Sequence, residues 1–169
     1  MSSLVRRALA VAATVLVALG GLGGCSRKEF ADRSAVVVVG DARTTFDIDS
    51  CGRDGRTIYV VGRAEAGGVV QAVMDLRRDK ATAVRSATGM TFDVDASSDD
   101  TRVAAFGPVA WRRRGGTGAP PGRIDSARLR GSRVQFDGQV QALDAQDRPV
   151  PGADPQHFSF DARCDLPGT

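Results

Sequence analysis

Apolar and polar residues alternate with a period of two from Ala35 onward, and this pattern constrains the fold more than any other feature. Side chains of a β-strand point alternately to its two faces, so such alternation is typical of strands buried on one face. It recurs in the segments 46–49, 58–63, 90–95, 134–142 and 158–161, and 36–39 is a β-branched run. We therefore predict an all-β domain of roughly eight to ten antiparallel strands, folded as a sandwich or a partly closed barrel.

Turn residues separate these segments at the spacing that hairpins require. Asp54-Gly55 and Gly131-Ser132 predict short hairpin turns, and Asp99-Asp100 predicts a further turn. The stretches 115–122 and 147–155 are rich in glycine or proline, so we expect loops there.

The segment 69–76 fits two periods. Val69, Val73 and Leu76 have helical spacing, whereas apolar residues at every second position from Val70 alternate with Gln71 and Asp75. We favour a strand, because the preceding glycines make a poor helix N-cap and the neighbouring segments are strands.

The N-terminus predicts a lipoprotein signal peptide. Arg6 and Arg7 precede the apolar run 8–19, which is shorter than the roughly 20 residues that span a bilayer. The following Leu22-Gly23-Gly24-Cys25 matches the lipobox of bacterial lipoproteins. That resemblance implies that a peptidase cuts before Cys25 and that its thiol carries lipid.

We accordingly divide the chain into a signal peptide (1–24), a lipidated cysteine with a short polar tether (25–34) and a β-rich globular domain (35–169). Two or three acyl chains hold a protein stably to a membrane, where one chain holds it only marginally. The expected location is the extracytoplasmic face of the cell membrane, with the lipid as anchor. The alternatives are a conventional secretory cut elsewhere and an uncut membrane anchor.

Three cysteines in an exported chain leave one without a cysteine partner. If lipid occupies Cys25, Cys51 and Cys164 remain, and export places them in an oxidising compartment. We predict a Cys51–Cys164 disulfide; the alternative is two separate buried thiols.

The charge balance argues against a nucleic-acid partner. The formal net charge is +3, and two of the 23 basic residues, Arg6 and Arg7, belong to the predicted signal peptide. The remaining excess is small and scattered along the sequence, so it predicts no nucleic-acid footprint.

Residues suited to catalysis are few. His157 is the single histidine, beside a proline-rich loop where a solvated surface position is the more common outcome. No Gly-x-Ser-x-Gly motif is present, and a disulfide would remove both remaining thiols as nucleophiles. We predict a non-enzymatic protein without a cofactor.

Two pairs of acidic residues, Asp47 with Asp49 and Asp93 with Asp95, could each line one face of a strand and bind a hard cation. Such alternating acids more often form the solvated face of a strand, so we predict no metal site.

One segment suggests a binding patch. Trp111 is followed by Arg112, Arg113 and Arg114, and an aromatic ring beside three cations could dock on anionic lipid or on a partner protein. The alternative is a strand end with solvated arginines.

The chain resembles the mycobacterial 19 kDa lipoprotein antigen family. The resemblance lies in the segments 22–25, 46–51, 67–74 and 158–164 and in the early and late cysteines. It implies an immunogenic envelope lipoprotein without enzymatic activity, recognised by host lipopeptide receptors, and the same disulfide. That family has a longer, glycosylated Thr/Ser/Ala-rich tether, which residues 26–34 do not match.

Two functions follow as hypotheses. The first is a membrane-anchored, non-enzymatic envelope lipoprotein that acts as an antigen, an adhesin-like protein or a structural binding module. The alternative is a carrier of lipid or of a small ligand, in which the two-sided apolar segments 58–61 and 69–76 line a cavity.

Overall fold

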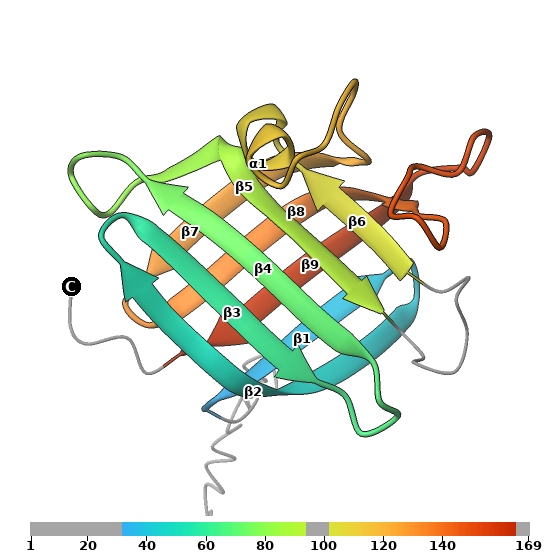
Figure 1. Ribbon diagram of the computed structural model, residues 1–169. Helices are drawn as coiled ribbons and strands as arrows, with labels where there is room; N and C mark the ends of the chain where they lie inside the picture. The colour runs from blue at the N-terminus through green and yellow to red at the C-terminus, as the bar shows by residue number, and fades with distance from the viewer. Residues whose placement is uncertain (1–31, 94–101, 165–169) are drawn as a thin grey trace, which may run out of the picture.

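The alternating segments fold as nine β-strands and one short helix in a computed structural model, which describes residues 32–93 and 102–164 (Figure 1). The elements are β1 (Ser34–Val39), β2 (Ala42–Asp54), β3 (Thr57–Arg63), β4 (Val69–Leu76), β5 (Ala83–Asp93), β6 (Arg102–Phe106), α1 (Pro108–Arg113), β7 (Arg123–Arg130), β8 (Arg133–Ala142) and β9 (Gln156–Arg163). The all-β prediction is confirmed, and the strands form a barrel. The predicted signal peptide and the Asp99-Asp100 turn lie outside the described residues.

The strands form one antiparallel sheet that closes on itself. Its order is β6-β5-β4-β3-β2-β1-β9-β8-β7, and a further pairing of β6 with β8 joins the two ends. The nine strands thus fill eight positions in the wall, because β6 and β7 both pair with the same edge of β8. Closure leaves few exposed strand edges, which are the usual sites of unwanted pairing between sheets.

The edge of β8 is shared between two strands in succession. β6 pairs with it at Ala142 and Gln141, and β7 continues from Gln139 to Arg133. The chain between β6 and β7 leaves the wall and returns to the same place, where the Phe106 N–H donates to the Pro121 carbonyl at 3.1 Å. β6 and β7 therefore act as one barrel strand that is interrupted by an insertion, residues 107–122.

Inward-facing side chains fill the barrel. Alternate residues of each strand point inside, as Val70, Ala72, Met74 and Leu76 do on β4, which confirms a strand at 69–76. An eight-stranded barrel has an interior just wide enough to be filled by side chains. The largest of the fully buried side chains are Phe46, Phe136, Phe158, Phe160, Ile58, Met74, Leu76 and Met90.

Both predicted hairpin turns are present. Asp54 pairs with Thr57 and Arg130 with Arg133, so two residues connect the strands in each case. The first residue of each connection is a glycine with a positive φ, 58° at Gly55 and 55° at Gly131. Residues with a Cβ rarely adopt this backbone conformation.

The two ends of the barrel differ in what they carry. β1 begins at one end, which we call the N-terminal end; the β2–β3, β4–β5 and β7–β8 turns lie at the same end, on the left in Figure 1. The β1–β2, β3–β4 and β8–β9 connections lie at the opposite end, on the right. The chain therefore enters the barrel among three of its hairpin turns.

The predicted disulfide is present and closes the wall at the N-terminal end. β1 begins only at Ser34, which pairs with Asp47, so the rest of β2 extends beyond it. Cys51 on this extension is bonded to Cys164, just after β9, with a Cα–Cα distance of 5.7 Å. β2 and β9 are the strands on either side of β1. The disulfide therefore joins these two strands to each other beyond the point where β1 starts.

Replacing both cysteines, Cys51→Ser with Cys164→Ser, is expected to lower the melting temperature by roughly 10–20 °C. A cross-link over a separation of 113 residues stabilises the fold by about 4–5 kcal/mol in the chain-entropy model. Thermal unfolding followed by circular dichroism measures the effect. The wild-type protein melted with a reducing agent is the control and should match the double variant; equal melting temperatures with and without the reducing agent would contradict the assignment.

Candidate functional site

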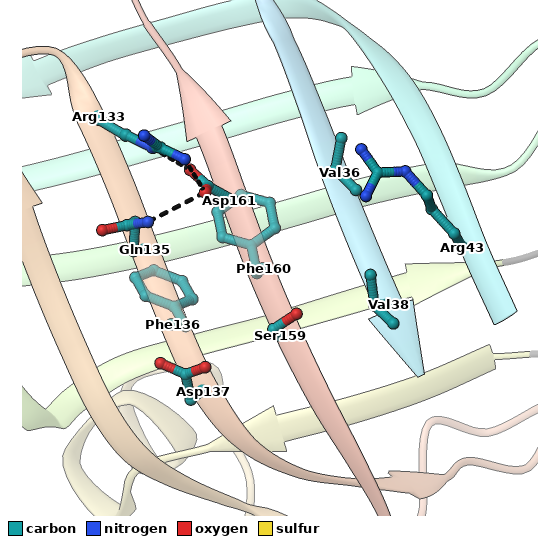
Figure 2. A pocket seen from close by; sticks show the side chains of 10 residues that line it. All are labelled: Val36, Val38, Arg43, Arg133, Gln135, Phe136, Asp137, Ser159, Phe160 and Asp161. Carbon is teal, nitrogen blue, oxygen red and sulfur yellow. Dashed lines mark hydrogen bonds and ion pairs between the residues drawn. The ribbon is translucent and has the colours of Figure 1, made fainter. Parts of the chain in front are cut away.

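A groove on the outer wall brings charged, polar and apolar side chains together (Figure 2). It lies over β1, β8 and β9 and has a volume of about 550 Å³, within the usual range for small-molecule sites. Val36 and Val38 of β1 form its apolar floor. Arg43 of β2 lies on one side, and the opposite side carries polar side chains of β8 and β9: Arg133, Gln135, Asp137, Ser159 and Asp161.

The polar side of the groove is organised around Asp161. Its carboxylate accepts two hydrogen bonds from the Arg133 guanidinium, at 2.7 and 2.5 Å, and one from the Gln135 amide at 3.0 Å. The side chains of Arg133 and Asp161 are only 34% and 23% exposed. A paired arginine–carboxylate bond of this kind fixes both groups, so this side of the groove is rigid.

This arrangement is suited to binding. The groove presents donors on Arg43 and Arg133, acceptors on Asp137 and Asp161, and an apolar floor. Such a surface can bind an extended ligand with polar groups on one side. Its lining contains no histidine or cysteine, so it lacks the usual pairing of a nucleophile with a base.

The groove does not follow from the local sequence pattern. Alternation in 134–142 and 158–161 identifies the outward-facing residues of β8 and β9, but it does not place β1 next to β9. That pairing joins segments more than a hundred residues apart, and only the closed sheet brings them together.

The predicted patch at Trp111 lies on the insertion between β6 and β7, in helix α1 and not in a strand. The Trp111 ring is 7% exposed and lies 5.5 Å from the ring of Phe106, and its indole N–H donates to the Thr117 carbonyl. The ring is therefore part of the packing of the insertion. A binding patch at this place would consist of the three arginines without the tryptophan.

Two glycines make this packing possible. A Cβ on Gly89 of β5 would lie 2.0 Å from the Phe106 ring, and a Cβ on Gly116 would lie 2.0 Å from the Trp111 ring. Each ring thus packs directly on the backbone of a glycine, in the space that the Cβ of any other residue would occupy. Together with Ala104, Ala110 and Leu143, the two rings form a second apolar cluster outside the barrel.

The three arginines after Trp111 are exposed, and two of them form ion pairs. Arg113 contacts the carboxylate of Asp75 on β4, and Arg114 lies 3.7 Å from Asp147 and 5.8 Å from the centre of the Phe106 ring. These contacts hold α1 against the wall. Within the described ranges, Arg112 makes no such contact.

The other candidate residues lie apart from one another. His157 is exposed on the outer face of β9. Asp49 pairs with Arg63 at 2.7 Å, and Asp95 lies outside the described residues. Among residues 32–93 and 102–164 there is no group of three metal-ligating side chains, and no helix there is long and apolar enough to cross a membrane.

Comparison with known proteins does not assign the chain to a family. No family model matches it, and no curated protein is similar enough to it to count as a match. The function therefore has to be argued from the residues and the structure.

We expect Trp111→Ala to lower the free energy of unfolding by about 3–5 kcal/mol, because it removes the largest side chain of the outer cluster. Arg112→Ala, next to it on α1, is the matched control and should change stability by less than about 0.5 kcal/mol. Denaturant unfolding of the two variants makes the comparison. If Trp111→Ala were as stable as the control, the ring would be free for binding.

Proposed function

We propose that this protein is an exported envelope lipoprotein, attached to the extracytoplasmic face of the cell membrane by lipid on Cys25. Its barrel is a non-enzymatic binding module. The proposal also includes membership of the mycobacterial 19 kDa lipoprotein antigen family, with a role as an antigen, an adhesin-like protein or a structural protein of the envelope.

The pairing of the cysteines carries this proposal. The chain has three cysteines, and the bond between Cys51 and Cys164 leaves Cys25 as the single thiol available to a lipid. Disulfides of this structural kind form in oxidising compartments, which an exported protein reaches. The lipobox at Leu22–Cys25 and the disulfide are independent features, and both agree with export.

The barrel supports a role in binding through its outer wall. The groove over β1, β8 and β9 is held by a fixed Arg133–Asp161 pair and stays open to solvent. An envelope lipid or a host receptor is the expected partner. The partner would contact the polar rim and the valine floor together.

The alternative function, carriage of a lipid inside the barrel, has less support. Side chains such as Phe46, Phe136 and Phe160 fill the interior, and Phe136 and Phe160 stack with ring centres 5.1 Å apart. A carried ligand would have to displace this core or bind in the outer groove instead. Native mass spectrometry of the purified protein distinguishes the two functions, because a carrier would retain lipid that is not covalently bound.

Replacing the proposed anchor residue, Cys25→Ala, should move the protein from the detergent phase to the aqueous phase in a phase-separation assay of the cell envelope. The reason is that the variant cannot carry the acyl chains, whereas the barrel and its disulfide are unchanged. Cys51→Ser is the matched control, since it removes a cysteine but leaves the anchor. Intact mass of the wild-type protein should show cleavage before Cys25 and added acyl mass. An unmodified thiol at Cys25 would refute the proposal.

A further inference from the structure

Basic side chains gather at the N-terminal end of the barrel, although the protein has a formal net charge of only +3. They come from the start of β1, from the three hairpin turns at this end and from the strand residues next to them. The basic residues are Arg33, Arg53, Arg56, Arg77, Arg78, Lys80, Arg128, Arg130, Arg133 and Arg163. The acidic residues at this end are Asp32, Asp54, Asp75, Asp79 and Asp161.

Contacts within the structure hold the β2–β3 and β4–β5 turns next to each other. The Arg53 guanidinium donates to the carbonyl of Lys80 at 3.2 Å, and the Leu76 N–H donates to the carbonyl of Arg56 at 2.8 Å. The charges of the two turns therefore belong to one surface.

Most of the acidic groups at this end are already engaged. Asp32 pairs with Arg163 at 3.3 Å, and Asp75 pairs with Arg113. Asp79 accepts hydrogen bonds within its own turn, from the hydroxyl and N–H of Thr82 and the N–H of Ala81; these lower its pKa to about 2. Asp79 therefore stays charged, but the ten basic residues at this end outnumber the five acidic ones, so the surface keeps a net positive charge.

Several of the cations remain without an acidic partner. Five exposed side chains at the N-terminal end form no ion pair with any residue in the ranges 32–93 and 102–164: Arg56, Arg78, Lys80, Arg128 and Arg130. Three lie on or beside the β2–β3 and β4–β5 turns, and two lie at the end of β7. These five side chains place positive charge without an acidic partner around this end, and we call them the positive rim.

The opposite end has the reverse balance. The residues there include the acidic Asp41, Glu65, Asp93, Asp144, Asp147 and Asp154 and the basic Arg43, Arg63, Arg102, Arg114 and Arg148. Hydrogen bonds from the Arg148 N–H and guanidinium lower the pKa of Asp144, so that this acid stays charged. The charge of the barrel is thus polarised along its axis.

We propose that the N-terminal end of the barrel is a docking surface for the anionic lipid headgroups of the membrane that holds Cys25. This inference rests on the proposed lipid anchor. The chain enters the barrel at this end, and eight residues lie between Cys25 and Ser34, a span of at most about 30 Å when fully extended. The positive rim is therefore the part of the barrel that the anchor brings closest to the headgroups.

The attraction is strong enough to orient the barrel. A Lys or Arg near an anionic membrane contributes about five-fold in affinity, and the effect acts within a Debye length of about 10 Å at 0.1 M salt. Several cations on one rigid rim act together once the anchor has brought them within this distance. The opposite end has no such excess of cations, so the attraction acts on the N-terminal end alone and turns that end toward the membrane.

Limited proteolysis of the natively acylated protein tests this orientation. Trypsin cuts after Arg77, Arg78 and Lys80 at the N-terminal end and after Arg63, the exposed last residue of β3, at the opposite end. In vesicles containing phosphatidylglycerol, cleavage at 77–80 is expected to slow by more than about ten-fold relative to vesicles of phosphatidylcholine alone. Cleavage after Arg63 should be the same in both. Raising the salt to about 1 M, where the Debye length is about 3 Å, should remove the protection.

Two matched double variants identify the charges responsible. Arg128→Gln with Arg130→Gln removes two cations of the rim but no cleavage site at 77–80, and should abolish most of the protection. Arg102→Gln with Arg148→Gln removes two cations at the opposite end, but neither the site at 77–80 nor the site after Arg63, and should leave the protection unchanged.

Three results would overturn the inference: equal cleavage at 77–80 in the two kinds of vesicle, protection that persists at high salt, or equal loss in both double variants. Intact mass of the same sample separates this outcome from failure of the proposed function. An acylated protein without protection retains its anchor and loses only the docking surface. A protein without acyl chains fails the anchor proposal itself.

Discussion

Closure of the sheet is the constraint on which the rest of the structure depends. The edge of β8 must be covered along its whole length, and β6 covers two residues of it before the chain leaves the wall. β7 covers the remainder. β6 and β7 lie one after the other along the same edge of β8. The insertion 107–122 between them can therefore leave the wall without opening the barrel. The second apolar cluster around Phe106 and Trp111 then packs this insertion against the outside.

Much of the fold could be predicted from local pattern. The period of two identified the core faces of β3, β4, β8 and β9, and the glycine turns at Gly55 and Gly131 fixed two hairpins. Sandwich and barrel could not be distinguished in this way, because both have strands with one buried face. The difference lies in the pairing of β6 with β8, which rests on two residue pairs between segments with no distinctive sequence.

The insertion shows where local pattern misleads. Trp111 followed by three arginines is the composition of an exposed docking patch, but the ring fills the space over Gly116 and beside Phe106. The helix is only six residues long, too short to show a helical period in sequence. Its position is set by tertiary contacts, among them the pair between Arg113 and Asp75. The groove over β1, β8 and β9 was missed for a related reason, since its parts meet only through the closed sheet.

Charge is the property in which the sequence and the structure differ most. Counted along the chain, the cations of the barrel are scattered and nearly balanced, and that count predicts no nucleic-acid footprint. The antiparallel order of the strands then gathers alternate connections at one end, and those connections are rich in arginine. A barrel attached by this end and attracted through it would stand on the membrane with its axis upright. The part of the groove around Val38, Asp137 and Ser159, which lies further along the wall, would then remain exposed to the envelope, so that one end could serve attachment while the wall serves binding.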